Sequence, residues 1–190
     1  MGDAAEDRRK AEQLPEGDIV RVLLEQHAQV RDLFAEIQKA PANERKEPFD
    51  RLRALLAVHE TAEELVLRPQ AKDNQWKDVA TERNQEEAEA NKVLASLEDM
   101  DTASEGFLEK LREFEESVDE HAEAEESQEF PRVLEAIDEE ERRKLGSRLQ
   151  AVEKTAPTHP HPAAAGSTTA VAMTGPFASM VDRVKDALSG

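Results

Sequence analysis

The chain has 190 residues, with 43 Asp and Glu against 25 Lys and Arg, so its formal net charge at pH 7 is −18. A surface this acidic repels nucleic acid and anionic lipid, which argues against binding to either. The absence of cysteine excludes disulfide scaffolds, zinc–thiolate sites, iron–sulfur clusters and thiol nucleophiles. No apolar run approaches the ~20 residues of a membrane span, and the N-terminus lacks the apolar stretch of a signal peptide. We therefore expect a soluble, cytoplasmic protein.

The N-terminal part of the chain is a polar lead followed by a helix. Residues 1–17 end in Pro15-Glu16-Gly17 and have the composition of a disordered segment. From Asp18, which has the side chain of an N-cap, to Gln38 the apolar residues recur at helical spacing. Ala40-Pro41 then ends this first helix.

Three further long helices are expected, followed by one short helix. The second begins at Asn43, tolerates a proline in its first turn and is stopped by Pro69. The third spans about 74–99, and the fourth runs from a Ser104 cap to 129, where Pro131 stops it. Residues 138–154 form a short, highly charged fifth helix that packs along Leu145 and Leu149.

These elements predict an all-α protein with three parts after the lead. Four long helices joined by short loops favour an up-down-up-down four-helix bundle, which with the fifth helix covers residues 18–154. Residues 155–175 are rich in Pro, Ala and Thr and are expected to form a flexible linker. The last segment, 176–190, is short and amphipathic, and its apolar face could dock on the bundle or on a second subunit.

Two segments repeat the pattern H-x-x-x-E-E-x-x-x-x-P with identical offsets. The first begins at His59 and the second at His121. The preceding helices also align without gaps, QHAQVRDLFAEI on EEAEANKVLASL, which places Glu87 opposite His27. The chain therefore contains two copies of a helical hairpin, and a duplication of this kind creates a pseudo-twofold site between the copies.

The spacing inside each repeat brings its His and its first Glu to the same face of a helix. A residue four positions further lies within 40° of the first and about 6 Å along the axis, so both side chains can reach one point. His59 pairs in this way with Glu63, and His121 with Glu125. The fifth residues, Glu64 and Glu126, point about 140° away and are expected to be solvated.

In each long helix these polar residues interrupt an apolar stripe, so they require compensation inside the bundle. No Lys or Arg is evidently aimed at the same point, and Arg31 and Arg83 are the only expected counter-charges. Three imidazoles and three carboxylates form a complete inner shell for two bridged metal ions, and ligation by N and O without S suits iron or manganese. The candidate ligands are His27, His59, Glu63, Glu87, His121 and Glu125.

Over residues 18–131 the sequence resembles the hemerythrin-like family, whose HHE cation-binding domain is a four-helix bundle with a non-haem di-iron centre. The family pattern has a His on helix one, H-x-x-x-E on helix two, a His on helix three and H-x-x-x-E on helix four. The matching residues are His27, His59 with Glu63, and His121 with Glu125. The resemblance implies two iron ions with an oxo or hydroxo bridge, and O₂ or another small diatomic or peroxide as ligand.

The third position departs from the family pattern, because no His lies between His59 and His121. Either Glu87 replaces that His as an oxygen ligand, or the site is a mononuclear remnant; we favour replacement because the rest of the shell is intact. The residue directly after His59, Glu60, corresponds to a position that is occasionally an additional ligand or a neighbour of the ligands in such domains. The simpler expectation, which we prefer, is that Glu60 is a surface acid.

A carboxylate in place of a neutral imidazole favours Fe(III) and disfavours reversible oxygen carriage. The resemblance then implies sensing or detoxification of O₂, peroxide or nitric oxide, or handling of iron; whether the protein is an enzyme stays open. One alternative is a metal- or redox-responsive signalling module that acts through its C-terminal segment. Another is a metal-free bundle whose acids confer solubility. The sequence does not reveal the oligomeric state.

Overall fold

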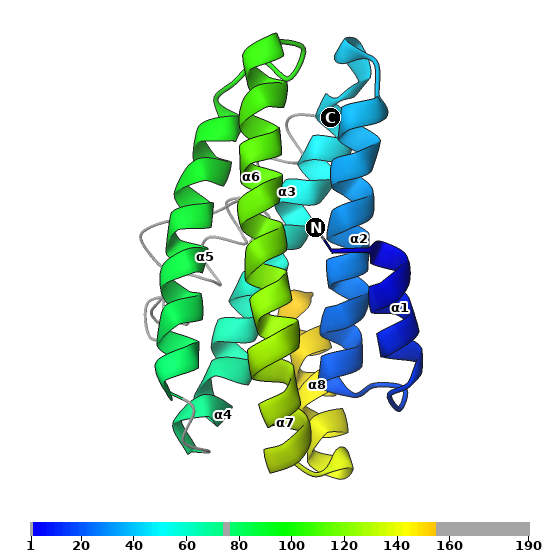
Figure 1. The fold of residues 1–190 in the computed structure, drawn as a ribbon, viewed down its shortest axis with the longest axis vertical. Coiled ribbons are helices and arrows are strands. Elements are labelled where there is room, and N and C mark those ends of the chain that lie inside the picture. The colour runs from blue at the N-terminus through cyan, green and yellow to red at the C-terminus, as the bar shows by residue number, and fades with distance from the viewer. Residues whose placement is uncertain (1, 74–76, 155–190) are drawn as a thin grey trace.

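A computed structural model describes residues 2–73 and 77–154, and within these ranges the chain forms helices and short turns (Figure 1). The predicted linker 155–175 and segment 176–190 lie outside the described residues. The elements in chain order are α1 (Ala4–Glu12), α2 (Ile19–Lys39), the 3₁₀ turn η1 (Ala42–Glu44), α3 (Lys46–Ala62), the π-helical turn η2 (Glu63–Leu67), α4 (Arg68–Asp73), α5 (Lys77–Glu98), α6 (Glu105–Ala124), the π-helical turn η3 (Glu125–Glu129), α7 (Phe130–Ala136) and α8 (Glu139–Glu153).

The helices α2, α3, α5 and α6 lie side by side along the long axis of the molecule (Figure 1). α2 packs against α3 and α5 packs against α6, and further contacts join α2 to α6 and α3 to α5. This arrangement is the helical bundle that the sequence predicts. α1 and α8 both pack against α2, so the bundle has two additional helices on that side.

Several predicted helix ends are confirmed by their caps. The Asp18 side chain accepts a hydrogen bond of 3.0 Å from the backbone N–H of Val20, and α2 ends at Lys39, before Pro41. Ser104 Oγ accepts from the N–H of Phe107 at 3.1 Å and caps α6. Each cap satisfies a backbone donor that the first helical turn leaves without a partner.

The apolar core consists of two clusters with a polar layer between them. Along α2, the residues from Ile19 to Leu24 belong to the first cluster and those from Val30 to Ile37 belong to the second. His27 lies between them in sequence and is 4% exposed. The second cluster also contains Leu94 and Leu97 of α5. The polar layer therefore has one apolar cluster on each side of it along the bundle.

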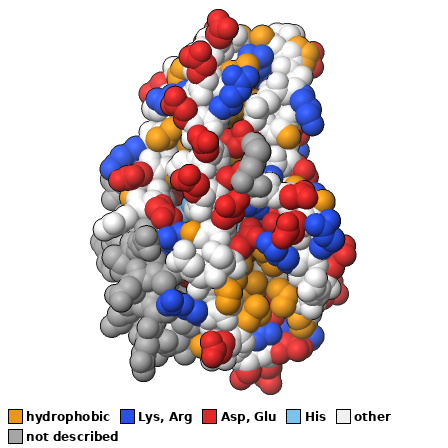
Figure 2. All heavy atoms as spheres, viewed as in Figure 1, with side chains coloured by type: hydrophobic (Ala, Val, Ile, Leu, Met, Phe, Trp, Pro, Cys, Tyr) orange, Lys and Arg blue, Asp and Glu red, His pale blue; other side chains and the backbone are white. Residues whose placement is uncertain are grey.

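Carboxylates are spread over the visible face of the molecule, as the net charge of −18 requires (Figure 2). In the part of the chain that the structure describes, no helix has both the length and the apolar character needed to cross a membrane.

The expectation of a disordered lead over residues 1–17 is wrong, because most of this segment forms α1. The Asp3 side chain caps the helix by accepting from the N–H of Ala5 at 2.9 Å. Asp7 and Ala11 are buried against the bundle, and Asp7 forms an ion pair with Arg31 of α2. These contacts are tertiary, so the polar composition of the lead did not reveal them.

The expectation that Pro69 and Pro131 stop their helices is also wrong. In each repeat a π-helical turn precedes the proline, and the helix continues as α4 or α7. The backbone N–H of Arg68 donates to the carbonyl of Glu63, five residues earlier, and Phe130 donates to Glu125 in the same way. The wider turn accommodates a residue that would otherwise clash with the preceding turn and has no N–H to donate.

Candidate metal centre

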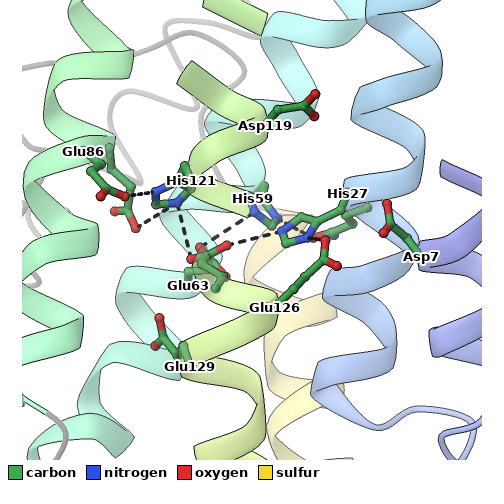
Figure 3. A network of polar contacts seen from close by, with 12 residues as sticks. Asp7, His27, His59, Glu63, Glu86, Asp119, His121, Glu126 and Glu129 are labelled. Atoms are coloured by element: carbon green, nitrogen blue, oxygen red, sulfur yellow. Dashed lines mark hydrogen bonds and ion pairs between the residues drawn. The ribbon is translucent and has the colours of Figure 1, made fainter. Parts of the chain in front are cut away.

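The six side chains singled out from the sequence converge between the two apolar clusters. α2 supplies His27, α3 supplies His59, and α6 supplies His121, and the three imidazoles face a common interior region (Figure 3). Glu63 and Glu125 stand at the first residues of the two π-helical turns, and Glu87 comes from α5. All six are largely buried: Glu63 and Glu125 are 0% exposed, and the most exposed side chain, that of His121, is 15% exposed.

Each imidazole is oriented by an acceptor on its Nδ1 atom. His27 Nδ1 lies 3.1 Å from Glu126 Oε1, and His121 Nδ1 lies 2.8 Å from Glu86 Oε2. His59 Nδ1 lies 2.7 Å from Gln26 Oε1. Since these oxygens only accept, each Nδ1 carries the proton and leaves Nε2 as the ligand atom. Such outer partners fix the tautomer and the ring orientation of histidines that bind metals.

The ligand atoms form two overlapping groups, each able to hold one metal ion. His27, His59 and Glu125 make the first group, which we call the imidazole position. Glu63, Glu87, His121 and Glu125 make the second group, which we call the carboxylate position; within each group the ligand atoms lie within 4.8 Å of one another.

The two positions are joined by carboxylates that face both of them. Glu125 Oε2 lies 3.3 Å from His27 Nε2, and Glu125 Oε1 lies 3.3 Å from His121 Nε2. Glu63 Oε2 lies 3.7 Å from His59 Nε2, so this second carboxylate also reaches toward the imidazole position. Carboxylates in this relation can bridge two ions.

The structure contradicts the expectation that no Lys or Arg is aimed at this point. Arg68 is 2% exposed, and its Nη2 lies 2.9 Å from Glu125 Oε1 and 3.4 Å from Glu63 Oε2. The same Nη2 forms an ion pair with Glu87, while Nη1 lies 2.5 Å from Glu129 Oε2. Arg68 is therefore the counter-charge of the carboxylate position, and Glu129 is a further buried carboxylate of the site that the sequence did not indicate.

Arg68 reaches the centre because of the π-helical turn that precedes it. In a regular α-helix the residue five positions after Glu63 would point about 140° away from it. In the wider turn, whose backbone hydrogen bond joins Arg68 N–H to Glu63 O, the fifth residue lies above the first. The sequence signal for this turn was Pro69, in the middle of an otherwise continuous helical pattern.

Glu64 and Glu126 are not solvated, contrary to expectation. Glu64 is 3% exposed, and the side chain of Glu126 is 8% exposed. In an isolated four-helix bundle these helix faces would be open to water, but here α8 packs against η2, and α1 brings Lys10 to Glu126. Lys10 of α1 lies 2.7 Å from Glu126 Oε2, and Arg31 lies 3.2 Å from its other oxygen.

The two expected counter-charges lie beside the centre. Arg31 forms ion pairs with Asp7, Asp119 and Glu126, and thereby holds the acceptor of His27 in place. Arg83 lies 3.0 Å from Glu86, the acceptor of His121.

Burial and the density of charge shift the pKa values of the central residues. Burial, together with Glu125, raises the pKa of Glu63 well above its usual value. Burial and the neighbouring His27 lower the pKa of His59 to about 3, so this imidazole is neutral and ready to act as a ligand. Burial alone would raise the pKa of Glu125, but His121 and His27 hold it well below its usual range.

Several ligand atoms of the centre are buried without a hydrogen-bond partner among the described residues. They are His27 Nε2, His121 Nε2, Glu63 Oε1, Glu87 Oε2 and Glu125 Oε2. Buried polar atoms normally have partners, and cations at the two positions would stabilise these groups. The set of imidazole nitrogens and carboxylate oxygens, without sulfur, fits iron or manganese.

A pocket lies beside the imidazoles, and its wall contains apolar side chains together with the charged residues Arg31, Glu87 and Asp119. His27, His59 and His121 contribute to its wall together with Val30, Leu56 and Val118. Glu60 also lines this pocket and accepts a hydrogen bond from Asn91, but it belongs to neither ligand group. The pocket is suited to a small, weakly polar ligand next to the imidazole position.

Comparison with known proteins gives one family and one relative. The family model described as the hemerythrin HHE cation binding domain matches residues 18–133. An uncharacterised hemerythrin-like protein of Schizosaccharomyces pombe is 28% identical over 134 residues, which cover 69% of this chain and 66% of the relative. The match thus spans slightly less than two thirds of that relative's length. No solved structure matches.

Proposed function

The chain belongs to the hemerythrin HHE cation binding domain family, and we propose that its converging His and Glu side chains bind iron. We further propose that the protein reacts with a small oxidant or diatomic ligand. The proposal includes the up-down-up-down order of α2, α3, α5 and α6, a metal-binding domain over residues 18–154 and a cytoplasmic location. Bound iron supplies electron transfer and an open coordination position for O₂, peroxide or nitric oxide.

The observation that carries the proposal is the pair of overlapping ligand groups. Three imidazoles whose Nδ1 atoms already have acceptors aim Nε2 inward, and Glu125 faces both positions. Two ions bridged by Glu125 and Glu63 are therefore our preferred occupancy. A metal-free bundle would gain nothing from burying so many ligand atoms without hydrogen-bond partners, because each costs free energy.

The chain's own residues favour detoxification or sensing over oxygen carriage. Glu87 brings a negative charge to the position where the family pattern has a neutral imidazole. That charge stabilises the ferric state more than the ferrous state, so a lasting reduced form is disfavoured. Val30, Leu56 and Val118 narrow the pocket beside the imidazoles, which favours a small ligand.

The direct test is the iron content of the full chain after expression in iron-supplemented medium. We expect more than one iron per chain, with near-ultraviolet charge-transfer absorption in the oxidised form. His59→Ala combined with Glu63→Ala should abolish this iron. The matched control is Glu120→Ala, which removes an exposed carboxylate next to His121. A protein that is iron-free, or whose iron is unchanged in the double variant, would overturn the proposal.

A second experiment separates oxygen carriage from the proposed roles. The reduced protein is mixed rapidly with O₂ and its absorbance is followed. We expect oxidation that removal of O₂ does not reverse. A lasting spectral change that reverses on deoxygenation would contradict this part of the proposal.

A further inference from the structure

Arg68 occupies the carboxylate position from within the chain. Its Nη2 contacts Glu63, Glu87 and Glu125, which are three of the four members of that ligand group. A guanidinium and a metal cation fulfil the same electrostatic need here, because either one neutralises carboxylates that are buried in a medium of low dielectric constant. Nη2 contacts Glu87 Oε1 and Glu125 Oε1, the same two oxygens that face His121 Nε2, so a cation held between them and His121 would have to displace it.

The imidazole position shares only Glu125 with Arg68. The ion pairs of Arg68 are formed with Glu63, Glu87, Glu125 and Glu129, and none involves His27 or His59. Glu125 divides its two oxygens: Oε1 faces Arg68, while Oε2 faces His27 at 3.3 Å. A first ion can therefore bind at His27, His59 and Glu125 while Arg68 stays in place.

Glu129 gives Arg68 a second partner outside both ligand groups. Glu129 Oε2 lies 2.5 Å from Arg68 Nη1, the guanidinium nitrogen that does not contact the ligand groups, and Glu129 is 0% exposed. When a metal ion displaces Nη2 from Glu63, Glu87 and Glu125, the Nη1 contact can persist and keep the guanidinium paired. Glu129 thus lowers the cost of moving Arg68 aside, which would otherwise leave a buried charge without a partner.

We propose that Arg68 competes with a metal ion for the carboxylate position, so that the two positions fill in sequence, the imidazole position first. This inference rests on the proposed function. In the metal-free protein the guanidinium stabilises the carboxylates in place of a cation. During loading it lowers the affinity for the second ion far more than the affinity for the first, because the imidazole position shares only Glu125 with Arg68.

The test is a titration of the full-length, metal-free protein with Co²⁺, followed by calorimetry and visible absorption. The wild type should bind one ion tightly and a second at least about tenfold more weakly. Arg68→Met removes the charge but keeps an unbranched side chain, and it should tighten the second step by about tenfold or more. Arg142→Met is the matched control, because its buried partner Asp18, at 2.7 Å, belongs to neither ligand group.

Glu129→Gln is a second test of the competition, with the opposite expected effect on the second binding step. It also provides a test if Arg68→Met does not fold. Without the Glu129 carboxylate the displaced guanidinium loses its second partner, so the second step should weaken while the first step is unchanged. Two equal, tight steps in the wild type, or no change in either variant, would overturn the inference and leave the proposed function intact. Failure of the wild type to bind any Co²⁺ would overturn both.

Discussion

Gln26 and His59 are joined by a hydrogen bond of 2.7 Å between Gln26 Oε1 and His59 Nδ1. Gln26 directly precedes His27, so one turn of α2 both supplies a candidate ligand and orients a second one on α3. The amide nitrogen of Gln26 donates in turn to Glu153 at the end of α8. The side chain of Gln26 therefore connects α8 to the centre, in addition to the packing of α8 against η2.

Gln26→Leu should weaken metal binding by roughly 10–100-fold, because His59 loses the acceptor that fixes its tautomer and ring orientation. The matched control is Gln38→Leu on the same helix, where the amide donates to Glu115 at 2.6 Å. Metal affinity measured by competition with a chelator checks this prediction. Equal affinities in the two variants would show that the orientation of His59 does not matter.

Glu87 is predicted to replace the His of the family pattern. Glu87→Ala should lower the iron content, because the carboxylate position loses a ligand. Glu87→His should restore the iron and raise the reduction potential, since a neutral imidazole stabilises Fe(III) less than a carboxylate does. Iron analysis and redox titration measure both effects. Glu89→Ala, an exposed carboxylate on the same helix, is the control, and if Glu87→Ala behaves like it, Glu87 is no ligand.

Arg31 should be important for the stability of the metal-free fold. Its side chain is 8% exposed and pairs with Asp7, Asp119 and Glu126. Arg31→Met removes the cation that these three carboxylates share, although Glu126 keeps Lys10, and should lower the free energy of unfolding by roughly 3 kcal/mol.

Urea denaturation measures the effect of Arg31→Met, with Arg8→Met as the control. Arg8 pairs with Asp32 at the surface, where both side chains are about half exposed, so its loss should cost less than about 1 kcal/mol. A similar small loss for Arg31→Met would mean that the ion pairs of Arg31 contribute little to the stability of the fold.

Gly146 of α8 lies where a larger residue does not fit. A Cβ atom at this position would overlap the carbonyl oxygen of Gly17, a backbone atom in a turn with φ of 80°. Gly146→Ala should therefore destabilise the protein by about 1–3 kcal/mol. Gly106→Ala, in the first turn of α6, meets only Met100 Cε at 3.8 Å and should be neutral or stabilising by up to about 1 kcal/mol. Thermal unfolding of both variants checks the difference, and equal shifts would contradict the close contact.

The sequence predicted the bundle and the convergence of the candidate ligands, because both depend on local helical spacing. The i, i+4 relation of His59 to Glu63 and the internal alignment of Glu87 with His27 needed no tertiary information. The structure brings all six residues into two overlapping groups.

The features that the sequence missed depend on contacts between distant segments or on a change of helical pitch. α1 is held by Asp7 and Lys10, whose partners lie far along the chain. Arg68 reaches the centre only because η2 adds one residue to a turn. A uniform 100° per residue places that side chain on the outer face, so the counter-charge of the site could not be derived from periodicity.

The most direct measurement is anomalous diffraction at the iron absorption edge from crystals of the iron-loaded protein. We expect the strongest anomalous peak inside the bundle, bonded to His27, His59 and Glu125, with a second peak between Glu63, Glu87 and His121 when iron is in excess. Iron found only at surface carboxylates, with the interior imidazoles unligated, would contradict the account.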